Sequence, residues 1–164
     1  RRYPDLSAGW IFVEPGFNFR PTEIQAALGL GQLTQLDKNL ATRRKIHAAW
    51  TEVIERQYGE HFELQQVLAG HDHAAFGLGL LVREGSPVHR GDLSRFLALR
   101  GIQTRPLIAG NFTRHPVIDR LRHRVASSGL PNADAVHDRG LMVGISGATR
   151  AEPLLSALDA FVRD

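Results

Sequence analysis

The feature that most constrains the fold is a run of apolar residues at helical spacing between Thr22 and Arg56. Side chains on one face of a helix recur every three or four residues. The run follows that interval at Ile24, Leu28, Leu33, Leu36, Leu40, Ile46, Trp50, Val53 and Ile54. Pro21 and Thr22 suit a first turn, where the missing N–H of proline costs no hydrogen bond. We therefore predict one long helix, with Gly29 and Gly31 inside it.

Short apolar runs and amphipathic segments alternate along the rest of the chain. They predict strands over residues 62–67, 74–83, 103–108 and 140–146, and helices over residues 89–100, 132–139 and from Thr149 onward. This order predicts an α+β fold, in which helices cover one face of a small, mainly antiparallel sheet. We expect Leu28, Leu36, Trp50 and Phe96 to bury one contiguous core. Residues 1–20 are interpreted as an N-terminal segment and residues 21–164 as one domain.

Composition narrows the class of protein. The chain is 43% hydrophobic and 23% charged, which is ordinary for a globular protein. It has no cysteine, which excludes a disulfide framework and fits a cytoplasmic protein. Its net charge is only +3 and its arginines are spread along the chain, so we expect no nucleic-acid partner. It begins Arg1-Arg2-Tyr3, without a methionine or an apolar leader. We therefore expect a piece of a longer protein that does not span a membrane.

One polar stretch before the predicted helix carries residues that suit an anionic ligand. Asn18 and Arg20 lie in a loop between Pro15 and Pro21. An amide, a guanidinium and the free N–H groups of a helix start can all donate hydrogen bonds to phosphate. Alternatively, Asn18 shapes a turn and Arg20 is a solvated surface residue.

A second polar stretch contains Arg105, Asn111 and Arg114, with Gly110 among them. Bidentate arginines and an amide suit a ligand that carries phosphates and hydroxyls, and glycine lets the backbone pass close to a ligand. The alternative is a turn at the end of a strand, with Arg105 in a surface ion pair.

The histidines do not predict a metal site. His71 and His73 flank Asp72, but no third ligand lies at a fixed helical or hairpin offset from them. A solvated loop is therefore the preferred interpretation, and we expect this chain to hold no metal.

The two polar stretches together resemble the C-terminal part of a known enzyme family. Residues 16–29 read Gly-Phe-Asn-Phe-Arg-Pro-Thr-Glu-Ile-Gln-Ala-Ala-Leu-Gly, and residues 104–116 read Thr-Arg-Pro-Leu-Ile-Ala-Gly-Asn-Phe-Thr-Arg-His-Pro. Both are similar to the DegT-type nucleotide-sugar aminotransferases, which are vitamin B6 enzymes of fold type I. The second stretch looks like the 3-dehydrase (3-dehydratase) branch, although that branch prefers Leu and Gln where Phe112 and His115 stand. The resemblance covers nearly the whole chain and implies a small C-terminal domain, with a large cofactor domain upstream.

The resemblance also implies roles for individual residues. Asn18 would contact the phosphate of pyridoxal or pyridoxamine phosphate in the neighbouring subunit of a homodimer, so residues 1–20 would include an active-site loop. The residues implied to bind the nucleotide-sugar substrate come from both stretches: Phe17, Arg20, Arg105, Asn111 and Arg114.

The residue that handles the cofactor proton in this family is a Lys or a His upstream of this region. We therefore expect no catalytic residue in this chain, and Lys38 and Lys45 match no such motif. The isolated chain should be inactive. One dehydrase subgroup holds an iron–sulfur cluster through upstream cysteines, which leaves the presence of a cluster open.

The reaction implied by the resemblance removes the C3 hydroxyl of an NDP-4-keto-6-deoxyhexose in lipopolysaccharide or deoxysugar biosynthesis. The first alternative is a nucleotide-sugar aminotransferase, which delivers an amine to the sugar. The second is a non-catalytic binding or assembly module of the same fold.

Overall fold

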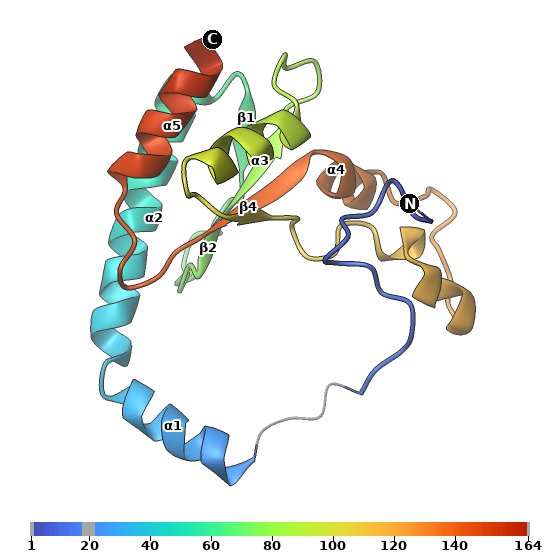
Figure 1. Cartoon of the computed structure of the whole chain (residues 1–164), viewed down its shortest axis with the longest axis horizontal. Helices are drawn as coiled ribbons and strands as arrows, with labels where there is room; N and C mark the ends of the chain where they lie inside the picture. Colours follow the sequence, from blue (N-terminus) through green and yellow to red (C-terminus); the bar gives the residue numbers. More distant parts are fainter. Residues whose placement is uncertain (1, 18–21, 164) are drawn as a thin grey trace.

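The computed structural model describes residues 2–17 and 22–163 (Figure 1). The helices are α1 (Glu23–Leu33), α2 (Leu36–Tyr58), α3 (Arg90–Leu99), α4 (Pro131–Arg139) and α5 (Glu152–Arg163). The strands are β1 (Phe62–Leu64), β2 (Gly77–Val82), β3 (Thr104–Arg105) and β4 (Gly140–Gly144). Two short 3-10 helices, η1 (Phe112–Arg114) and η2 (Pro116–Arg120), lie between β3 and α4.

The four strands form one sheet in the order β1-β2-β4-β3, and every neighbouring pair is antiparallel. Leu80 pairs with Leu64 on one side and with Leu141 on the other. Thr104 pairs with Val143 at the far edge. The mixed fold with a small antiparallel sheet is therefore confirmed.

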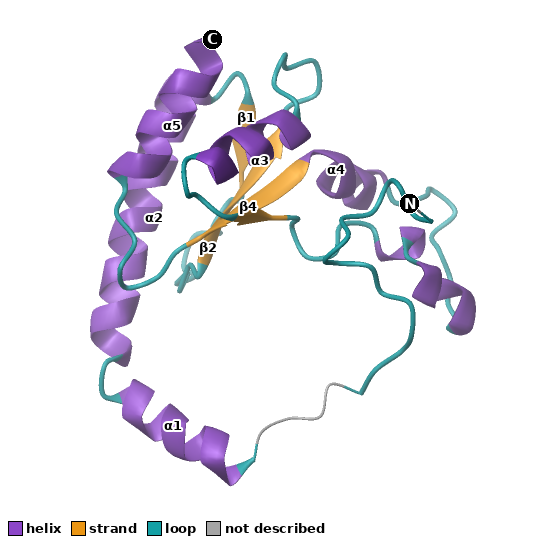
Figure 2. Ribbon diagram, in the orientation of Figure 1, coloured by secondary structure: helices purple, strands orange, loops and turns teal. Residues whose placement is uncertain are grey.

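The main core lies between one face of the sheet and the helices α2, α3 and α5 (Figure 2). Alternate residues of β2 point into it, and Leu80 is fully buried there. Trp50 of α2 is also buried, and its indole Nε1 donates a hydrogen bond to the carbonyl of Ala151 at 3.0 Å. Phe96 packs against this core from α3. The predicted burial of Trp50 is confirmed, and Phe96 is partly buried.

The opposite face of the sheet carries glycines where other segments come close. A β-carbon on Gly79 would lie 3.1 Å from the side chain of Leu107. One on Gly140 would lie 2.4 Å from the carbonyl oxygen of Val136 in α4. The absence of these β-carbons lets Leu107, in the segment after β3, pack directly on the sheet. It also lets α4 end at Gly140 and continue directly into β4.

The predicted single long helix is wrong, because the chain breaks between α1 and α2. Gln35 leaves the helical region with φ −111° and ψ 4°. The hydroxyl of Thr34 donates to the carbonyl of Gly31 at 2.8 Å, and the amide of Gln35 bonds the carbonyl of Gln32 at 3.1 Å. These tight bonds replace the regular ladder. Gly29 and Gly31 also weaken the last turns of α1, since glycine disfavours a helix interior.

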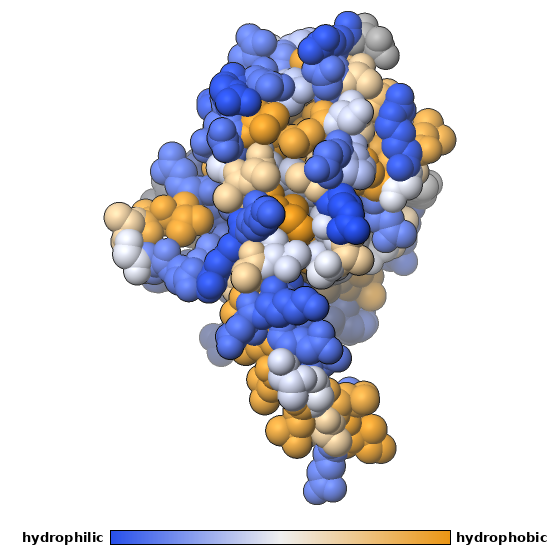
Figure 3. Space-filling model, turned by 90° about the vertical axis from the view of Figure 1, so that its left-hand side faces the viewer, coloured by the Kyte–Doolittle hydropathy of each residue, from blue (hydrophilic) through white to orange (hydrophobic). Residues whose placement is uncertain are grey.

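The break directs α1 away from the rest of the chain, as Figure 1 shows. None of its residues is buried, and its large apolar side chains are exposed: Ile24 by 75%, Leu28 and Leu30 by 68%, and Leu33 by 61%. Apolar atoms accordingly gather on the narrow lower projection in Figure 3. The expected burial of Leu28 and Leu36 is wrong for this chain, because no described segment covers them. Neither α1 nor any other helix within the described ranges is long and apolar enough to cross a bilayer.

Candidate functional site

Asn111 anchors the loop that follows β3. Its side chain is almost fully buried, with 3% of its surface exposed. The amide Nδ2 donates to Asp134 Oδ1 of α4 at 2.7 Å, and Oδ1 accepts from the amide and hydroxyl of Thr113 at 3.0 and 2.6 Å. Asn111 therefore caps η1 and ties this loop to α4. Its predicted role at the substrate stays a prediction.

His137 supports the same loop from α4. Its Nδ1 accepts a hydrogen bond from the backbone amide of Asn111 at 3.2 Å, which requires the neutral ring. Burial lowers the pKa of His137, and the charge of Arg114 lowers it further, while a backbone hydrogen bond with Asp5 and the Asp138 carboxylate act in the opposite direction. The neutral imidazole is thus the form that fits this position.

Gly110 makes its close approach to His137 rather than to an open ligand space. It has φ +66°, and a β-carbon there would lie 2.6 Å from both Cα and Nδ1 of His137. Glycine is therefore required both by the backbone conformation and by the packing.

His115 joins the N-terminal segment to this loop. It is buried, and its Nδ1 accepts from the amide of Phe12 at 3.4 Å. The Phe12 amide can only donate, so Nε2 carries the proton and donates to the carbonyl of Ala109 at 2.9 Å. The Phe12 ring stands edge-on to the imidazole, with centroids 5.2 Å apart. The backbone amide of Val117 also donates to the carbonyl oxygen of Phe12 at 2.9 Å. These contacts hold the N-terminal segment at Phe12 against the loop that follows β3.

Arg114 lies beside two carboxylates of α4. Its NH1 is 2.6 Å from Asp138 Oδ1 and 3.7 Å from Asp134 Oδ1. Asp134 also accepts from Asn111, so the structure brings Asn111 and Arg114 together around one carboxylate. Arg114 is already paired, and its predicted contact with substrate stays a prediction.

Arg105 lies at the end of β3 and is exposed. Its guanidinium carbon is 5.8 Å from the ring centroid of Trp10 and 6.0 Å from that of Phe76. The alternative surface ion pair is not found, because no carboxylate of the described residues pairs with Arg105. Arg105 is therefore a cation held beside aromatic faces and open to an anionic ligand.

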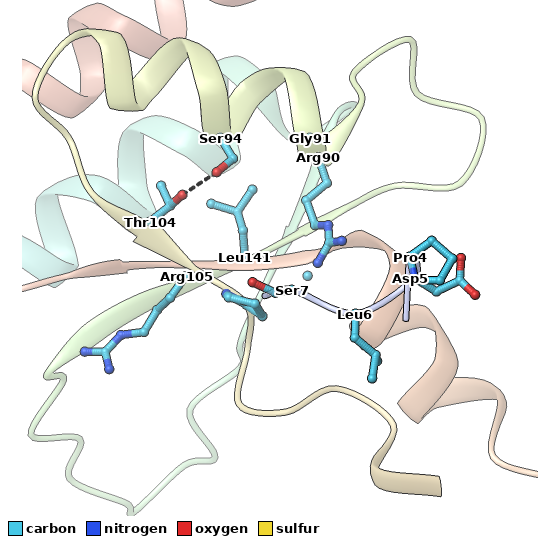
Figure 4. Close-up of a pocket in the computed structure, with 12 residues that line it drawn as sticks. Pro4, Asp5, Leu6, Ser7, Arg90, Gly91, Ser94, Thr104, Arg105 and Leu141 are labelled. Atoms are coloured by element: carbon cyan, nitrogen blue, oxygen red, sulfur yellow. Dashed lines mark hydrogen bonds between the residues drawn. The ribbon is translucent and has the colours of Figure 1, made fainter. Parts of the chain in front are cut away.

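A cavity of about 280 Å³ lies between the N-terminal segment and the start of α3 (Figure 4). Arg90 enters it from α3, and Ser94 and Thr104 share a 2.7 Å hydrogen bond at its wall. Figure 4 shows the side chain of Arg105 pointing away from Leu6 and Ser7, toward the opposite side of β3.

The predicted N-terminal loop is only partly described. Asn18 and Arg20 lie outside the described residues, and Phe17 is 87% exposed immediately before them. Sequence reasoning did not identify Trp10, Phe76 or His137 as parts of the site. Their side chains meet the predicted stretch only through tertiary contacts, so no local spacing could have identified them.

The described residues do not form a complete site for a vitamin B6 cofactor. Lys38 and Lys45 are both exposed on α2, so no enclosed lysine amine for a Schiff base is found in residues 2–17 and 22–163. The available donors suit only a phosphate or an anionic substrate group. Any covalent attachment would need a residue from another part of the protein.

The loop around His71 and His73 offers no metal centre in the described parts of the chain. Asp72 pairs with Arg44, and the His73 ring stands edge-on to His47 with centroids 5.1 Å apart. These contacts hold the loop against α2.

The sequence of this chain is similar to a known enzyme family. The model of the DegT/DnrJ/EryC1/StrS aminotransferase family matches residues 5–160. A dTDP-4-dehydro-2,6-dideoxy-D-glucose 3-dehydratase of Saccharopolyspora spinosa is 34% identical over 87% of this chain and 30% of its own length. The lipopolysaccharide biosynthesis protein RfbH of Salmonella typhimurium is 31% identical over 85% of this chain and 31% of its own length.

A solved GDP-4-keto-6-deoxymannose-3-dehydratase with a trapped PLP-glutamate geminal diamine is similar in structure. Its TM-score is 0.75 at 26% identity, over 90% of this chain and 37% of that one. The chain thus spans about a third of the length of these relatives.

Proposed function

The chain belongs to the DegT/DnrJ/EryC1/StrS aminotransferase family, and on that premise we propose that it is the C-terminal part of a nucleotide-sugar 3-dehydratase. The substrate would be an NDP-4-keto-6-deoxyhexose, and the reaction would remove its C3 hydroxyl. The product would feed lipopolysaccharide or deoxysugar synthesis. The similarity to two sugar 3-dehydratases, each over more than four fifths of the chain, supports this choice.

The cofactor would be pyridoxal or pyridoxamine phosphate, whose conjugated ring supplies an electron sink when it is bound. Asn18 would donate to its phosphate from the neighbouring subunit. The catalytic Lys or His would lie in the upstream domain, which these relatives have the length to contain. The 164-residue chain alone should therefore be inactive.

The substrate-facing residues of this chain would bind and orient. Arg105 carries the proposal, because its exposed guanidinium lies beside Trp10 and Phe76 without a carboxylate partner among the described residues. It would hold an oxygen-rich anionic or sugar group. Asn111 and Arg114 would contact the substrate from the adjacent loop, and Phe17 and Arg20 would face its nucleotide end.

A homodimer is part of the proposal. The apolar side chains of α1 are exposed, and exposed apolar patches of this kind mark interaction surfaces. The upstream domain and a second subunit would cover α1, and the loop after Phe17 would reach across to the partner's cofactor. We place the assembled enzyme in the cytoplasm, without a nucleic-acid or membrane partner.

Product analysis tests the proposal. The full-length protein is incubated with pyridoxamine phosphate and GDP-4-keto-6-deoxymannose, and the sugar product is measured by mass spectrometry. A dehydratase gives a 4-keto sugar in which hydrogen replaces the C3 hydroxyl, so the product is lighter than the substrate by the mass of one oxygen atom, while pyridoxamine phosphate is converted to pyridoxal phosphate and ammonia. The 164-residue chain under the same conditions should leave the substrate unchanged.

The second candidate function is a sugar aminotransferase, which the family description favours. It would give a 4-amino sugar that keeps its C3 oxygen. An upstream lysine in place of histidine at the cofactor would accompany that outcome. A full-length protein that binds neither cofactor nor nucleotide-sugar would instead be the non-catalytic module.

A further inference from the structure

Leu6 and Phe12 attach the N-terminal segment to the rest of the chain, and Figure 1 shows this segment beside α4 and the short helices that follow β3. Leu6 is buried, with 5% of its surface exposed. Phe12 is half-buried and bonds His115 and Val117 through its backbone. Residues 13–17, which follow, are all exposed. Phe12 is therefore the point at which the buried part of the segment gives way to its exposed part.

His115 can hold Phe12 only as a neutral ring. Its Nδ1 accepts from the amide of Phe12 at 3.4 Å, and its Nε2 donates to the carbonyl of Ala109 at 2.9 Å. A proton on Nδ1 would set two N–H donors against each other and remove the first of these bonds. Phe12 would then keep the hydrogen bond from Val117 and the ring contact with Phe112. Protonation of His115 therefore weakens the attachment of the segment.

His137 has the same hydrogen-bonding pattern. Its Nδ1 accepts from the amide of Asn111 at 3.2 Å. A hydrogen bond with the backbone of Asp5 raises the pKa of His137, as a bond donated by the ring to a carbonyl does. A proton on Nδ1 would oppose the Asn111 amide and detach the loop from α4. The ring centroids of His115 and His137 are 6.0 Å apart, so two protonated rings would also repel each other.

The charged groups near the two rings come from different parts of the chain: Asp5 of the N-terminal segment, Arg90 of α3, Arg114 of η1, and Asp134 and Asp138 of α4. Both aspartates of α4 pair with Arg114, which offsets their negative charge. Burial and the charge of Arg114 lower the pKa of His137 by more than Asp5 and Asp138 raise it. The surroundings thus favour a neutral His137 ring while the segment is attached.

We propose that His115 and His137 form an acid-sensitive latch on the N-terminal segment. While both rings are neutral, they hold Phe12 and Asn111 together through the loop after β3. Protonation of the rings releases residues 10–17 from this loop, while the main core, to which neither histidine belongs, stays folded. Release involves no ligand and no reaction, so the inference goes beyond the proposed function and does not depend on it.

The direction of the effect follows from the linkage between protonation and attachment. In the attached state the pKa of His137 lies below its ordinary value of 6.5. A basic group whose pKa is lowered in one state favours that state above its ordinary pKa and disfavours it as the pH falls. The latch should therefore be closed at pH 7.5 and should open increasingly as the pH falls below 6.5.

Hydrogen–deuterium exchange of the full-length protein measures the release, with labelling times scaled to the intrinsic exchange rate at pH 7.5, 6.5 and 5.5. Peptides that contain the amides of Phe12 and Val117 report the latch, and peptides from β2 report unfolding of the core. Protection at Phe12 and Val117 should fall about tenfold or more between pH 7.5 and 5.5, because one protonated histidine can shift the equilibrium about tenfold for each pH unit below its ordinary pKa. Both amides should exchange faster than those of β2 at every pH.

Variants identify the groups that control the release. His115→Asn and His137→Asn each keep an acceptor near the position of Nδ1 but cannot be protonated there, so each should reduce the fall in protection by about threefold or more. His123→Asn removes an exposed histidine from the loop between η2 and α4 and should leave the fall unchanged. Glu14→Gln breaks the exposed ion pair of the N-terminal segment with Arg120 and should also leave it unchanged.

Protection at Phe12 that does not change with pH would overturn the latch. Exchange of Phe12 and β2 at the same rate would also overturn it, because the segment would then be released only when the whole core unfolds. These two comparisons need no substitution, so they decide the proposal even if a variant does not fold. A fall in protection that keeps its wild-type size in both Asn variants would overturn the proposal as well, because another group would then control the release.

Discussion

Gly110 lies so close to His137 that a β-carbon on it would be 2.6 Å from both Cα and Nδ1 of the histidine. The next residue, Asn111, donates its backbone amide to that same Nδ1 at 3.2 Å. This contact and this hydrogen bond fix the loop after β3 on α4, together with the hydrogen bond from the Asn111 side chain to Asp134. The positions of Asn111 and Arg114 depend on this attachment.

The contact with His137 predicts that alanine substitution destabilises the protein more at Gly110 than at Gly129, although both glycines have a positive φ. Gly110→Ala meets both a left-handed backbone and the His137 ring, so it should cost about 1–2 kcal/mol for the backbone and about 1–3 kcal/mol more for overpacking. Gly129→Ala has φ +74° but nothing within 4 Å of its new β-carbon, so it should cost only the backbone part. Urea unfolding of both variants measures the difference. Equal losses would show that the contact with His137 carries no energy.

The lowered pKa of His137 predicts acid-sensitive stability. The folded state favours the neutral ring, whereas the unfolded ring titrates near its ordinary pKa of 6.5. Below that pH the unfolded state binds more protons, so the free energy of unfolding should fall as the pH drops from 7.5 to 5.5. Burial and the nearby His73 lower the pKa of His47, so His47 acts in the same direction.

Single variants separate these contributions. His137→Asn keeps an acceptor near Nδ1 and removes the titrating ring, so its stability should depend less on pH over this range. His47→Gln should remove the part of the pH dependence of stability that comes from His47. A pH dependence unchanged in both variants would contradict the assignment to these histidines.

The exposure of α1 predicts that Leu28 matters little to the 164-residue chain by itself. Leu28→Ala should change its stability by less than about 0.5 kcal/mol, while Leu80→Ala in the buried core should cost about 2–5 kcal/mol. Chemical unfolding should show one cooperative transition in the parent chain.

In the full-length protein, Leu28→Asp should weaken the dimer as measured by ultracentrifugation. Equal dimerisation of that variant and the parent would remove α1 from the interface.

The periodic segments of the fold were predictable, and the places where the prediction failed have physical causes. The strand expected over residues 103–108 ends at Arg105, because Pro106 has no N–H to continue the ladder. The sequence did not indicate the helix break at Gln35, because apolar residues at helical spacing continue before and after it. The apolar spacing predicted Leu28 and Leu36 to be core residues, but no described part of the chain covers them.

The candidate site was predictable only where its residues are adjacent in sequence. Arg105, Asn111 and Arg114 lie within one stretch, and their residue types suit anion binding. His137 reaches Asn111 from 26 residues away, so its role depends on tertiary structure. Arg43 and Arg150 are far apart in the sequence, and only the fold places them in one groove with Arg105.

Substitution of Arg105 tests its proposed contact with the substrate. Arg105→Lys keeps the charge but loses the planar guanidinium, so dehydration by the full-length enzyme should fall about tenfold or more. Arg122→Lys is the control in an exposed loop. Activity and cofactor absorbance are measured together, so that a loss of cofactor is recognised. Full activity of Arg105→Lys would exclude a bidentate role.

The fate of the C3 oxygen tests the central claim most directly. A nucleotide-linked 4-keto-6-deoxyhexose carrying ¹⁸O at C3 is incubated with the full-length protein and pyridoxamine phosphate, and both the sugar and the released water are examined by mass spectrometry. The account predicts that the label leaves the sugar and appears in water. A 4-amino sugar that retains the label at C3 would contradict the dehydratase assignment.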